Sequence, residues 1–564
     1  DATTLASTID SYDTISAGIT DMTLASGATI NVDAGEITEM LADESAGRLT
    51  IDDQVITVNG ATTVDNANLL GATTTGKLTA TIATTETVTE LATLSADGGT
   101  NDLTIVLGTG NATVSTAAQL NTINAATAVA VDLTNVTALA GSNLSDLETL
   151  ASSITANEFS NDSGLTTIAV TDTTIDATTL ASTIDSYDTI SAGITDMTLA
   201  SGATINVDAG EITEMLADES AGRLTIDDQV ITVNGATTVD NANLLGATTT
   251  GKLTASIATT ETVTELATLS ADGGTNDLTI VIRAADATVS TAAQLNTINA
   301  ATAVAVDLTN VTALAGSNLS DLETLASSIN ANEFSNDSGL TTIAVTDTTI
   351  DATTLASTID SYDTISAGIT DMTLASGATI NVDAGEITEM LADESAGRLT
   401  IDDQVITVTG ATTVDNANLL GATTTGKLTA TIATTETVTE LATLSADGGT
   451  NDLTIVLGTG NATVSTAAQL NTINAATAVA VDLTNVTALA GSNLSDLETL
   501  ASSINANEFS NDSGLTTIAV TDTTIDATTL ASTIDSYDTI SAGITDMTLA
   551  SGATINVDAG EITE

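Results

Sequence analysis

The 564-residue chain contains no cysteine, histidine, proline or tryptophan, and aromatic residues make up only 1% of it. The absence of cysteine excludes disulfides and thiolate metal sites. The absence of histidine removes the usual general base beside a serine or threonine nucleophile. The sequence also lacks a run of about 18 apolar residues, so it predicts no membrane-spanning helix.

Positive charge is also scarce. Seven basic residues stand against 74 acidic ones, and the formal net charge is −67. Nucleic acid is therefore excluded as an expected partner, because phosphate binding needs a basic footprint. So acidic a chain would usually be disordered, but 42% hydrophobic residues and a positive mean hydropathy favour a folded protein.

No pattern of residues predicts an enzyme. A lysine base is chemically conceivable, but Lys77, Lys252 and Lys427 are the only lysines, and each is better placed as a charge at the start of a strand. A glycosidase needs one marked pair of carboxylates, and no pair stands out among the 74 acids. We therefore expect neither catalysis nor a small-molecule substrate.

A long internal repeat dominates the sequence. The stretch DATTLASTIDSYDT begins at Asp1, Asp176, Asp351 and Asp526, which gives a period of 175 residues. This period predicts three solenoid repeats and a partial fourth that form one continuous rod. Their bounds are 1–175, 176–350, 351–525 and 526–564. Because the chain starts inside a repeat, we also expect it to be a segment of a longer protein.

The copies differ at few positions. Thr81 becomes Ser256, Thr155 becomes Asn330, and Asn59 becomes Thr409. The longest difference replaces LGTGN at 107–111 by IRAAD at 282–286. Three nearly identical bodies are typical of a cable or spacer rather than of an enzyme.

A shorter unit recurs inside each long repeat. A β-branched or aliphatic residue is followed by Asp, Ser or Thr and then by leucines or isoleucines at helical spacing. Six such units, 24 to 32 residues long, fill the 175 residues without remainder. The polar residues at their starts are Asp33, Asp65, Thr89, Ser115, Ser145 and Asp176.

Each unit has the pattern of a strand followed by a helix. Segments 77–83 and 101–107 are rich in Thr, Ile, Val and Leu, which favours strands. The polar residue at each unit's start is then expected to be the N-cap of a short helix. Two units also predict capping boxes, Asp33 with Glu36 and Ser145 with Glu148.

A unit of this size cannot bury its own apolar side, but a stack of units can. The expected fold is therefore a mainly β, parallel β-solenoid with short helices and six coils per repeat. The alternative is a string of immunoglobulin-like or cadherin-like sandwiches, whose turns usually contain some proline. Aligned strand starts further predict that Lys77 lies between Arg48 and Asp102 on its two neighbouring coils, with Lys77 and Asp102 close enough to pair.

Two polar turns are candidate calcium sites, because calcium binds six to eight hard oxygens on tight turns. The candidate ligands are Asp97, Asn101 and Asp102 in one turn and Asn157, Glu158, Asn161 and Asp162 in the other. The other interpretation is a polar turn whose Asn and Asp side chains bind their own backbone. No cofactor is required for the expected fold, and calcium is an optional ligand. Ice binding is disfavoured, because positions equivalent to Thr81 include Asp52 and Asp132, which interrupt a threonine ladder.

The chain resembles the giant tandem-repeat surface proteins of bacteria, particularly of marine cyanobacteria. The resemblance is carried by units with the motif T-x-x-E-L-x-x-L, by extreme acidity, by the lack of cysteine and by nearly identical long repeats. The resemblance covers the whole chain through repeat style and composition. It implies export, an extracellular or cell-surface location and an extended shape, with no catalytic residues. The expected function is a structural fibre, stalk or surface layer that self-associates into fibres or bundles. The alternative is the stalk of a large, calcium-influenced adhesin whose binding tip lies outside this segment.

Overall fold

The computed structural model describes residues 1–14, 18–95, 97–190, 193–365, 368–540 and 543–559. Its internal contacts divide the chain into two compact units. The first unit comprises 1–261, 269–280 and 301–304, and the second comprises 262–268, 281–300 and 305–564. Within the described residues, no helix combines the length and apolar character that a membrane crossing needs.

The first unit alternates short strands with short helices. Its helices are α1 (Ala2–Asp13), α2 (Ile37–Ser45), α3 (Val64–Thr73), α4 (Val88–Leu91), α5 (Ala117–Asn124), α6 (Leu144–Thr155), α7 (Ala177–Asp188), α8 (Ile212–Ser220) and α9 (Val239–Thr248). Its strands are β1 (Thr29–Asp33), β2 (Val55–Thr62), β3 (Leu78–Ile82), β4 (Asp102–Thr104), β5 (Val131–Asp132), β6 (Ala138–Ser142), β7 (Phe159–Ser160), β8 (Thr167–Val170), β9 (Thr174–Asp176), β10 (Asp196–Thr198), β11 (Thr204–Asp208), β12 (Leu224–Thr225), β13 (Val230–Thr237), β14 (Leu253–Ile257) and β15 (Asp277–Thr279).

The second unit repeats this alternation. Its helices are α10 (Val263–Leu266), α11 (Ala292–Asn299), α12 (Leu319–Asn330), α13 (Ala352–Asp363), α14 (Ile387–Ser395), α15 (Val414–Thr423), α16 (Val438–Leu441), α17 (Ala467–Asn474), α18 (Leu494–Asn505) and α19 (Ala527–Asp538). Its strands are β16 (Val306–Asp307), β17 (Ala313–Ser317), β18 (Phe334–Ser335), β19 (Thr342–Val345), β20 (Thr349–Asp351), β21 (Asp371–Thr373), β22 (Thr379–Asp383), β23 (Leu399–Thr400), β24 (Val405–Thr412), β25 (Leu428–Ile432), β26 (Asp452–Thr454), β27 (Val481–Asp482), β28 (Ala488–Ser492), β29 (Phe509–Ser510), β30 (Thr517–Val520), β31 (Thr524–Asp526), β32 (Asp546–Thr548) and β33 (Thr554–Asn556).

The strands form many short parallel sheets. In the first unit the sheet orders include β1-β2-β3-β4 and β15-β14-β13-β11-β9, so each strand pairs with one from the preceding or following stretch of chain. The prediction of parallel strands is confirmed. Helices nevertheless account for 36% of the described residues, so "mainly β" describes the chain only in part.

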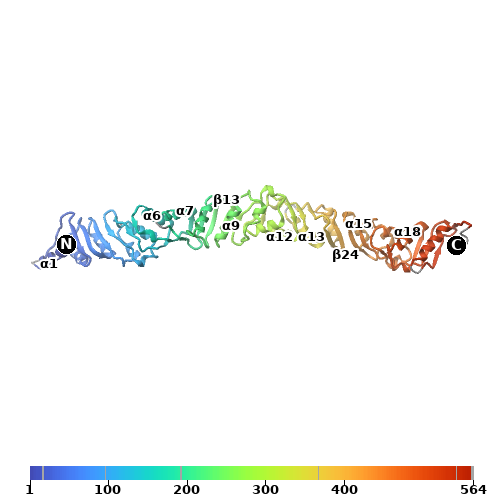
Figure 1. The fold of residues 1–564 in the computed structure, drawn as a ribbon, viewed down its shortest axis with the longest axis horizontal. Helices are drawn as coiled ribbons and strands as arrows, with labels where there is room; N and C mark the ends of the chain where they lie inside the picture. The colour runs from blue at the N-terminus through green and yellow to red at the C-terminus, as the bar shows by residue number, and fades with distance from the viewer. Residues whose placement is uncertain (15–17, 96, 191–192, 366–367, 541–542, 560–564) are drawn as a thin grey trace. The chain divides into compact units, whose positions relative to one another are not determined.

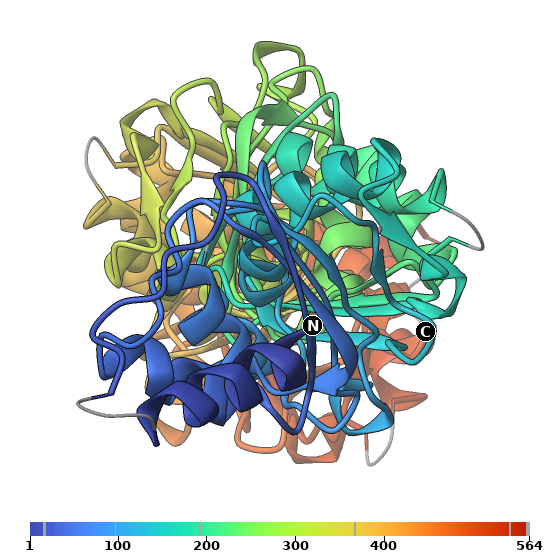
Figure 2. The ribbon, with the colours of Figure 1, turned by 90° about the vertical axis from the view of Figure 1, so that its left-hand side faces the viewer.

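Apolar side chains align from strand to strand and form the core. Ile30 of β1 lies opposite Ile56 of β2, and Ile56 lies opposite Leu78 of β3. All three are buried, whereas the residues between them along each strand are more exposed. Figure 2 shows these N-terminal strands in blue beside one another, with the blue helices to one side. The two-residue alternation of each strand therefore builds a continuous apolar ladder.

Successive helices also pack against one another, as Figure 1 shows for α6 and α7. Packed helices lie about 8–10 Å apart, whereas paired strands lie about 4.8 Å apart. The two spacings do not match, and several ladders contain a register shift, such as the one between Thr57 and Ala61 of β2. Short sheets interrupted by shifts accommodate this mismatch.

Helices α3, α4 and α6 begin one residue before the predicted N-cap, and α5 begins two residues after it. Thr63, Thr87, Thr116 and Asn143 are the caps, and each accepts a hydrogen bond from a backbone N–H of its own first turn. The residue after each cap is apolar and buried. Because this apolar residue must face the core, the helix starts there and leaves the preceding Thr or Asn as the cap. The predicted cap Asp176 is confirmed and accepts from the N–H of Thr179 at 3.0 Å, and its equivalents Asp351 and Asp526 cap their helices in the same way.

Both predicted capping boxes are wrong. Asp33 ends β1, and its carboxylate accepts from Asn59 Nδ2 at 3.0 Å. Glu36 is the N-cap of α2 without a side-chain cap hydrogen bond. Ser145 lies inside α6. The capping boxes that form pair Thr87 with Glu90 and Thr116 with Gln119.

Polar side chains connect several helices to the next stretch of chain. The first N–H of α4, from Val88, donates to Asn111 Oδ1 at 2.8 Å. The first N–H of α5 donates to Ser142 Oγ at 2.9 Å, and that of α6 donates to Asp172 Oδ2 at 2.8 Å. The first N–H groups of a helix have no partner within it. The next stretch of chain therefore supplies a hydrogen-bond acceptor for the helix, and this bond fixes that stretch against the start of the helix.

The predicted strand register is off by two residues. Thr79 lies opposite Asp102 and Ala80 opposite Leu103, so Lys77 does not face Asp102 directly. The ion pair between Lys77 and Asp102 forms all the same and is confirmed. A shift of two residues keeps every side chain on its face, so a long lysine can reach diagonally. Arg48 does not lie beside Lys77, because Arg48 precedes a segment that bridges to Thr23 instead.

Candidate functional site

The first predicted calcium turn is held mainly by its own backbone. The carbonyl of Asp97 accepts from the N–H groups of Thr100 and Asn101 at 2.9 and 3.0 Å. Asn101 is buried, and its Oδ1 accepts from the N–H of Leu78 at 3.3 Å. Asp102 is paired with Lys77. Of the three predicted ligands, Asp97 alone presents an exposed carboxylate at the surface.

The second turn depends on two asparagines in the left-handed region. Asn157 has φ 62° and follows α6, and Asn161 has φ 58° and follows β7. Asparagine adopts this conformation more readily than most residues. Asp162 is the first residue of the short 3₁₀ helix 162–164, and its carbonyl accepts a hydrogen bond from the N–H of Leu165 at 2.9 Å.

Asn161 also acts on a neighbouring carboxylate. Partial burial raises the pKa of Asp132, but hydrogen bonds from Thr134 and Asn161 outweigh it and leave the pKa below its ordinary value. The N–H of Thr134 donates to Asp132 Oδ1 at 2.8 Å. The side chain of Asn161 therefore stabilises the ionised carboxylate of Asp132, which lies in the preceding stretch of chain.

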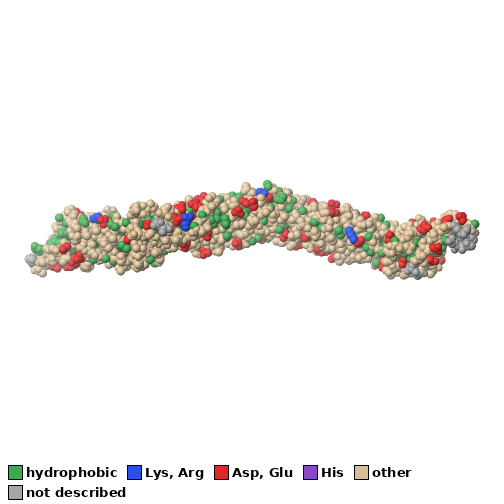
Figure 3. Space-filling model, in the orientation of Figure 1, with side chains coloured by type: hydrophobic (Ala, Val, Ile, Leu, Met, Phe, Trp, Pro, Cys, Tyr) green, Lys and Arg blue, Asp and Glu red, His purple; other side chains and the backbone are tan. Residues whose placement is uncertain are grey.

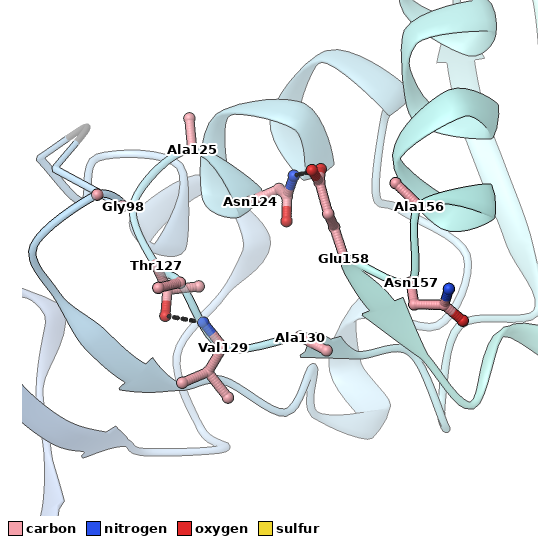
Figure 4. Close-up of a pocket in the computed structure, with 11 residues that line it drawn as sticks. Gly98, Asn124, Ala125, Thr127, Val129, Ala130, Ala156, Asn157 and Glu158 are labelled. Carbon is pink, nitrogen blue, oxygen red and sulfur yellow. Dashed lines mark hydrogen bonds between the residues drawn. The ribbon is translucent and has the colours of Figure 1, made fainter.

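A pocket of about 520 Å³ brings parts of both turns together. Figure 4 shows Gly98 on one side, Asn157 and Glu158 on the other, and the segment that follows α5 between them. Asn124 Nδ2 donates to Glu158 Oε2 at 2.6 Å across this space. Glu158 supplies the carboxylate among the lining residues. The pocket recurs in the third copy at about 570 Å³, where Asn474 donates to Glu508 at 2.7 Å.

Glu158 is the one acidic side chain among the residues that line this pocket. Calcium takes six to eight oxygen ligands, and within the described ranges no group of three or more acidic side chains converges on one point. Asn101, Asp102 and Glu158 already have partners in the fold. Calcium binding at the two turns stays a prediction, with Asp97 as the exposed carboxylate of the first turn.

A second pocket, of about 470 Å³, was not predicted from the sequence. Thr84–Thr87, Gly108–Asn111 and Asn135 line it. Burial, followed by the nearby charges of Glu90 and Asp65, raises the pKa of Glu86. The same pocket recurs in the third copy, lined by Thr434–Thr437, Gly458–Asn461 and Asn485. The replacement of 107–111 by 282–286 was the signal in the sequence, since the longest difference between the copies falls on this lining.

All seven basic side chains are engaged in ion pairs with aspartates. Arg48 pairs with Asp43 and, at 3.5 Å, with Asp13. The others are Lys77, Arg223, Lys252, Arg283, Arg398 and Lys427. Figure 3 shows acidic side chains scattered over the face in view and few basic ones. The basic side chains are thus engaged in ion pairs within the fold.

Comparison with protein-family models and with curated proteins gives no match. The functional argument therefore depends on the residues of this chain.

Proposed function

We propose that this chain is a structural protein of an extracellular fibre, stalk or surface layer. Its units stack in succession as a β-solenoid, and chains associate with one another without carrying out a reaction. The −67 charge sets the conditions of association, because parallel chains repel one another over about a Debye length, roughly 8 Å at 0.15 M salt and 3 Å at 1 M. Salt or calcium would act by screening this charge.

The observation that carries the proposal is the repetition of one interface. Tyr187 is buried, and its hydroxyl donates to the carbonyl of Leu147, forty residues earlier, at 3.0 Å. Tyr362 donates in the same way to Leu322, and Tyr537 to Leu497, each at 3.0 Å. A protein that repeats its internal contacts so closely gains length rather than a new surface, which is the use that solenoids serve.

Solution scattering of the isolated chain tests the stack. The maximum dimension of the particle is the quantity that decides, because a globule of this length, with a radius of gyration of about 25 Å, is about 65 Å across. Twenty predicted unit starts, from Asp1 to Asp558, leave nineteen intervals, so a stack at the strand spacing of about 4.8 Å is about 90 Å long and longer where helix packing sets the spacing. A particle with the dimensions of a globule would contradict the proposal.

Electron microscopy tests the association. We expect separate particles in low salt and bundles in 1 M salt or millimolar calcium, because both conditions screen the acidic surface. Chelation should separate the bundles formed in calcium without loss of the circular dichroism signal, because the apolar ladder needs no metal. Loss of that signal would make calcium a requirement for folding.

A further inference from the structure

Two of the three long repeats contain an Asn-Gly pair at the same point of a strand. Asn59-Gly60 lies in β2 and Asn234-Gly235 lies in β13, and the sequence has no other Asn-Gly pair. In the third repeat, β24 has Thr409-Gly410 at this point. The glycine has a φ of 89°, 88° and 88° in the three copies, a conformation that favours glycine. The glycine is therefore tied to the shape of the strand, whereas the residue before it varies.

The pair lies at an irregularity in the strand pairing. Strand β2 pairs with β1 as far as Asn59, which lies opposite Asp33. Its pairing with β3 stops at Thr57 and resumes at Ala61. Gly60 therefore lies beyond the end of the first ladder and inside the gap of the second. Strand β13 has the same end and the same gap.

Both residues of the pair are open to solvent. Asn59 and Gly60 are exposed, and so are Asn234 and Gly235. Apart from the neighbours of Gly60 in the chain, the nearest atom to the place that a Cβ would take there is Ala34 Cβ, at 3.8 Å. The backbone nitrogen of the glycine therefore has no side chain beside it, and water reaches the adjoining amide.

We propose that Asn59 and Asn234 are sites of spontaneous deamidation, with water as the co-reactant. The backbone nitrogen of the glycine attacks Cγ of the asparagine and loses its proton to solvent. The new N–C bond closes a succinimide ring, the bond from Cγ to Nδ2 breaks, and Nδ2 takes up a proton and leaves as ammonia. Water then opens the ring at one of its two carbonyls, which leaves aspartate or isoaspartate. The reaction needs no oxidant or reductant, and it is independent of the proposed function.

Deamidation changes the contact between β1 and β2. Asn59 Nδ2 donates to Asp33 Oδ1 at 3.0 Å. The reaction removes this donor and places a second carboxylate opposite Asp33, and two like charges on strands about 4.8 Å apart repel each other. The isoaspartate product also adds a methylene to the backbone of β2. The third repeat, where Thr409 lies opposite Asp383, keeps its contact unchanged.

Mass spectrometry of tryptic peptides tests the inference, because the basic residues of the chain flank each copy of this strand. Cleavage after Arg48 and Lys77 gives peptide 49–77, whose sequence is identical to that of peptide 224–252. Peptide 399–427 differs from both only by Thr409. It is therefore a matched control within the same digest, and it contains every other asparagine of the shared sequence.

The folded chain is incubated in a mildly alkaline buffer, because the attack requires loss of the glycine N–H proton. We expect the shared peptide 49–77 and 224–252 to gain, with time, the mass that replacement of NH2 by OH adds. Peptide 399–427 should not gain it. An isoaspartate-specific methyltransferase should label the shared peptide in parallel. Equal modification of the shared peptide and the control, or of neither, overturns the inference.

A double variant and a denatured sample complete the test. Asn59→Thr with Asn234→Thr introduces the residue that the third repeat already has at this point, so the strands should fold as β24 does, and the mass gain and the methyltransferase label should be lost from these peptides. A gain that persists in the double variant places the reaction at another asparagine and overturns the inference. Modification of the natural chain in urea but not in the folded state also overturns it, because the fold would then protect the pair.

Discussion

The loop at 107–111 and its counterpart at 282–286 solve one structural problem with different chemistry. In the first copy, Asn111 Oδ1 accepts from the N–H of Val88 at 2.8 Å, and Asn111 Nδ2 donates to the carbonyl of Glu86 at 3.0 Å. In the second copy, Asp286 Oδ2 accepts from the N–H of Val263 at 2.7 Å, so the acceptor for the first N–H of the helix is kept.

The difference lies in how the rest of the side chain is satisfied. A carboxylate has no N–H to donate, and Asp286 is 4% exposed. Arg283, which replaces Gly108, donates to Asp286 through Nε at 2.9 Å and Nη2 at 3.2 Å. The second copy therefore differs from the first by both the buried carboxylate of Asp286 and the arginine that neutralises it. The comparison teaches that the position requires an acceptor for the helix, whereas the rest of its chemistry can change if the loop changes with it.

The largest effect is expected from Asn111→Asp in the first copy. The change keeps the acceptor but loses the N–H donor and buries a carboxylate beside the carbonyl of Glu86 with no arginine in the loop. We expect the free energy of unfolding of the first compact unit to fall by about 3 kcal/mol, as for an unpaired buried charge. Urea denaturation measures this change. The control transplants the whole IRAAD block into 107–111. If the variant with the whole IRAAD block is destabilised as much as Asn111→Asp, the residues of this loop do not compensate for one another.

Arg283→Ala is the converse change in the second copy. It should cost about 2 kcal/mol, below the range for a fully buried pair, because the arginine side chain is 30% exposed and partly screened. Lys252→Ala is the matched control, since its ion pair with Asp277 joins a 46% exposed lysine and should contribute no more than about 1 kcal/mol. Equal losses in the two variants would mean that the pair at Arg283 is merely a surface pair.

The helix next to the loop offers a sharper and smaller test. Thr87 caps α4 with a hydrogen bond to its own side chain from the N–H of Glu90 at 3.2 Å, and Thr89 lies inside the helix. Thr87→Ala should cost about 1 kcal/mol, whereas Thr89→Ala should change the stability by less than about 0.5 kcal/mol. Native-state hydrogen exchange of residues 88–91 measures both. A larger effect at Thr89 would restore the cap predicted from the sequence.

The sequence was enough to predict features that depend on local pattern. The repeats, the parallel strands near 77–83 and 101–107 and the pair of Lys77 with Asp102 all follow from periodicity and alternation. The caps were misplaced because a polar residue on either side of the first apolar helical residue satisfies the same pattern, and the burial of Val88 or Leu144 decides between them. Burial is a property of the folded core.

The roles of the candidate site residues depended on contacts between distant units. Asn101 was predicted to be a calcium ligand, which stays a prediction, and in the structure its Oδ1 accepts from the N–H of Leu78, 23 residues earlier. Asn111 uses the same separation to reach Val88. A single sequence shows that these amides exist but not which stretch of chain lies beside them, so no local spacing could have assigned them.

The smallest expected effect is a difference between the two copies in the pH at which a capping-box glutamate becomes protonated. Glu90 and Glu265 both close capping boxes, and hydrogen bonds from the backbone and side chain of Thr87 and Thr262 lower their pKa values. The positive charge of Arg283 lowers the pKa of Glu265 further, and no basic side chain acts in this way on Glu90.

A carboxylate whose folded-state pKa lies below its unfolded value stabilises the protein above the unfolded pKa, and this contribution is lost as the pH falls through the folded one. Both capping boxes should therefore weaken in acid below about pH 4.3, the ordinary glutamate pKa, with Glu265 protonating at the lower pH. Carboxyl-carbon NMR titration measures both groups, and Arg283→Ala should raise the pKa of Glu265 while leaving Glu90 unchanged. No shift at Glu265 would mean that the arginine acts on Asp286 alone, whereas an equal shift of both glutamates would mean that the substitution does not act through the local charge of Arg283.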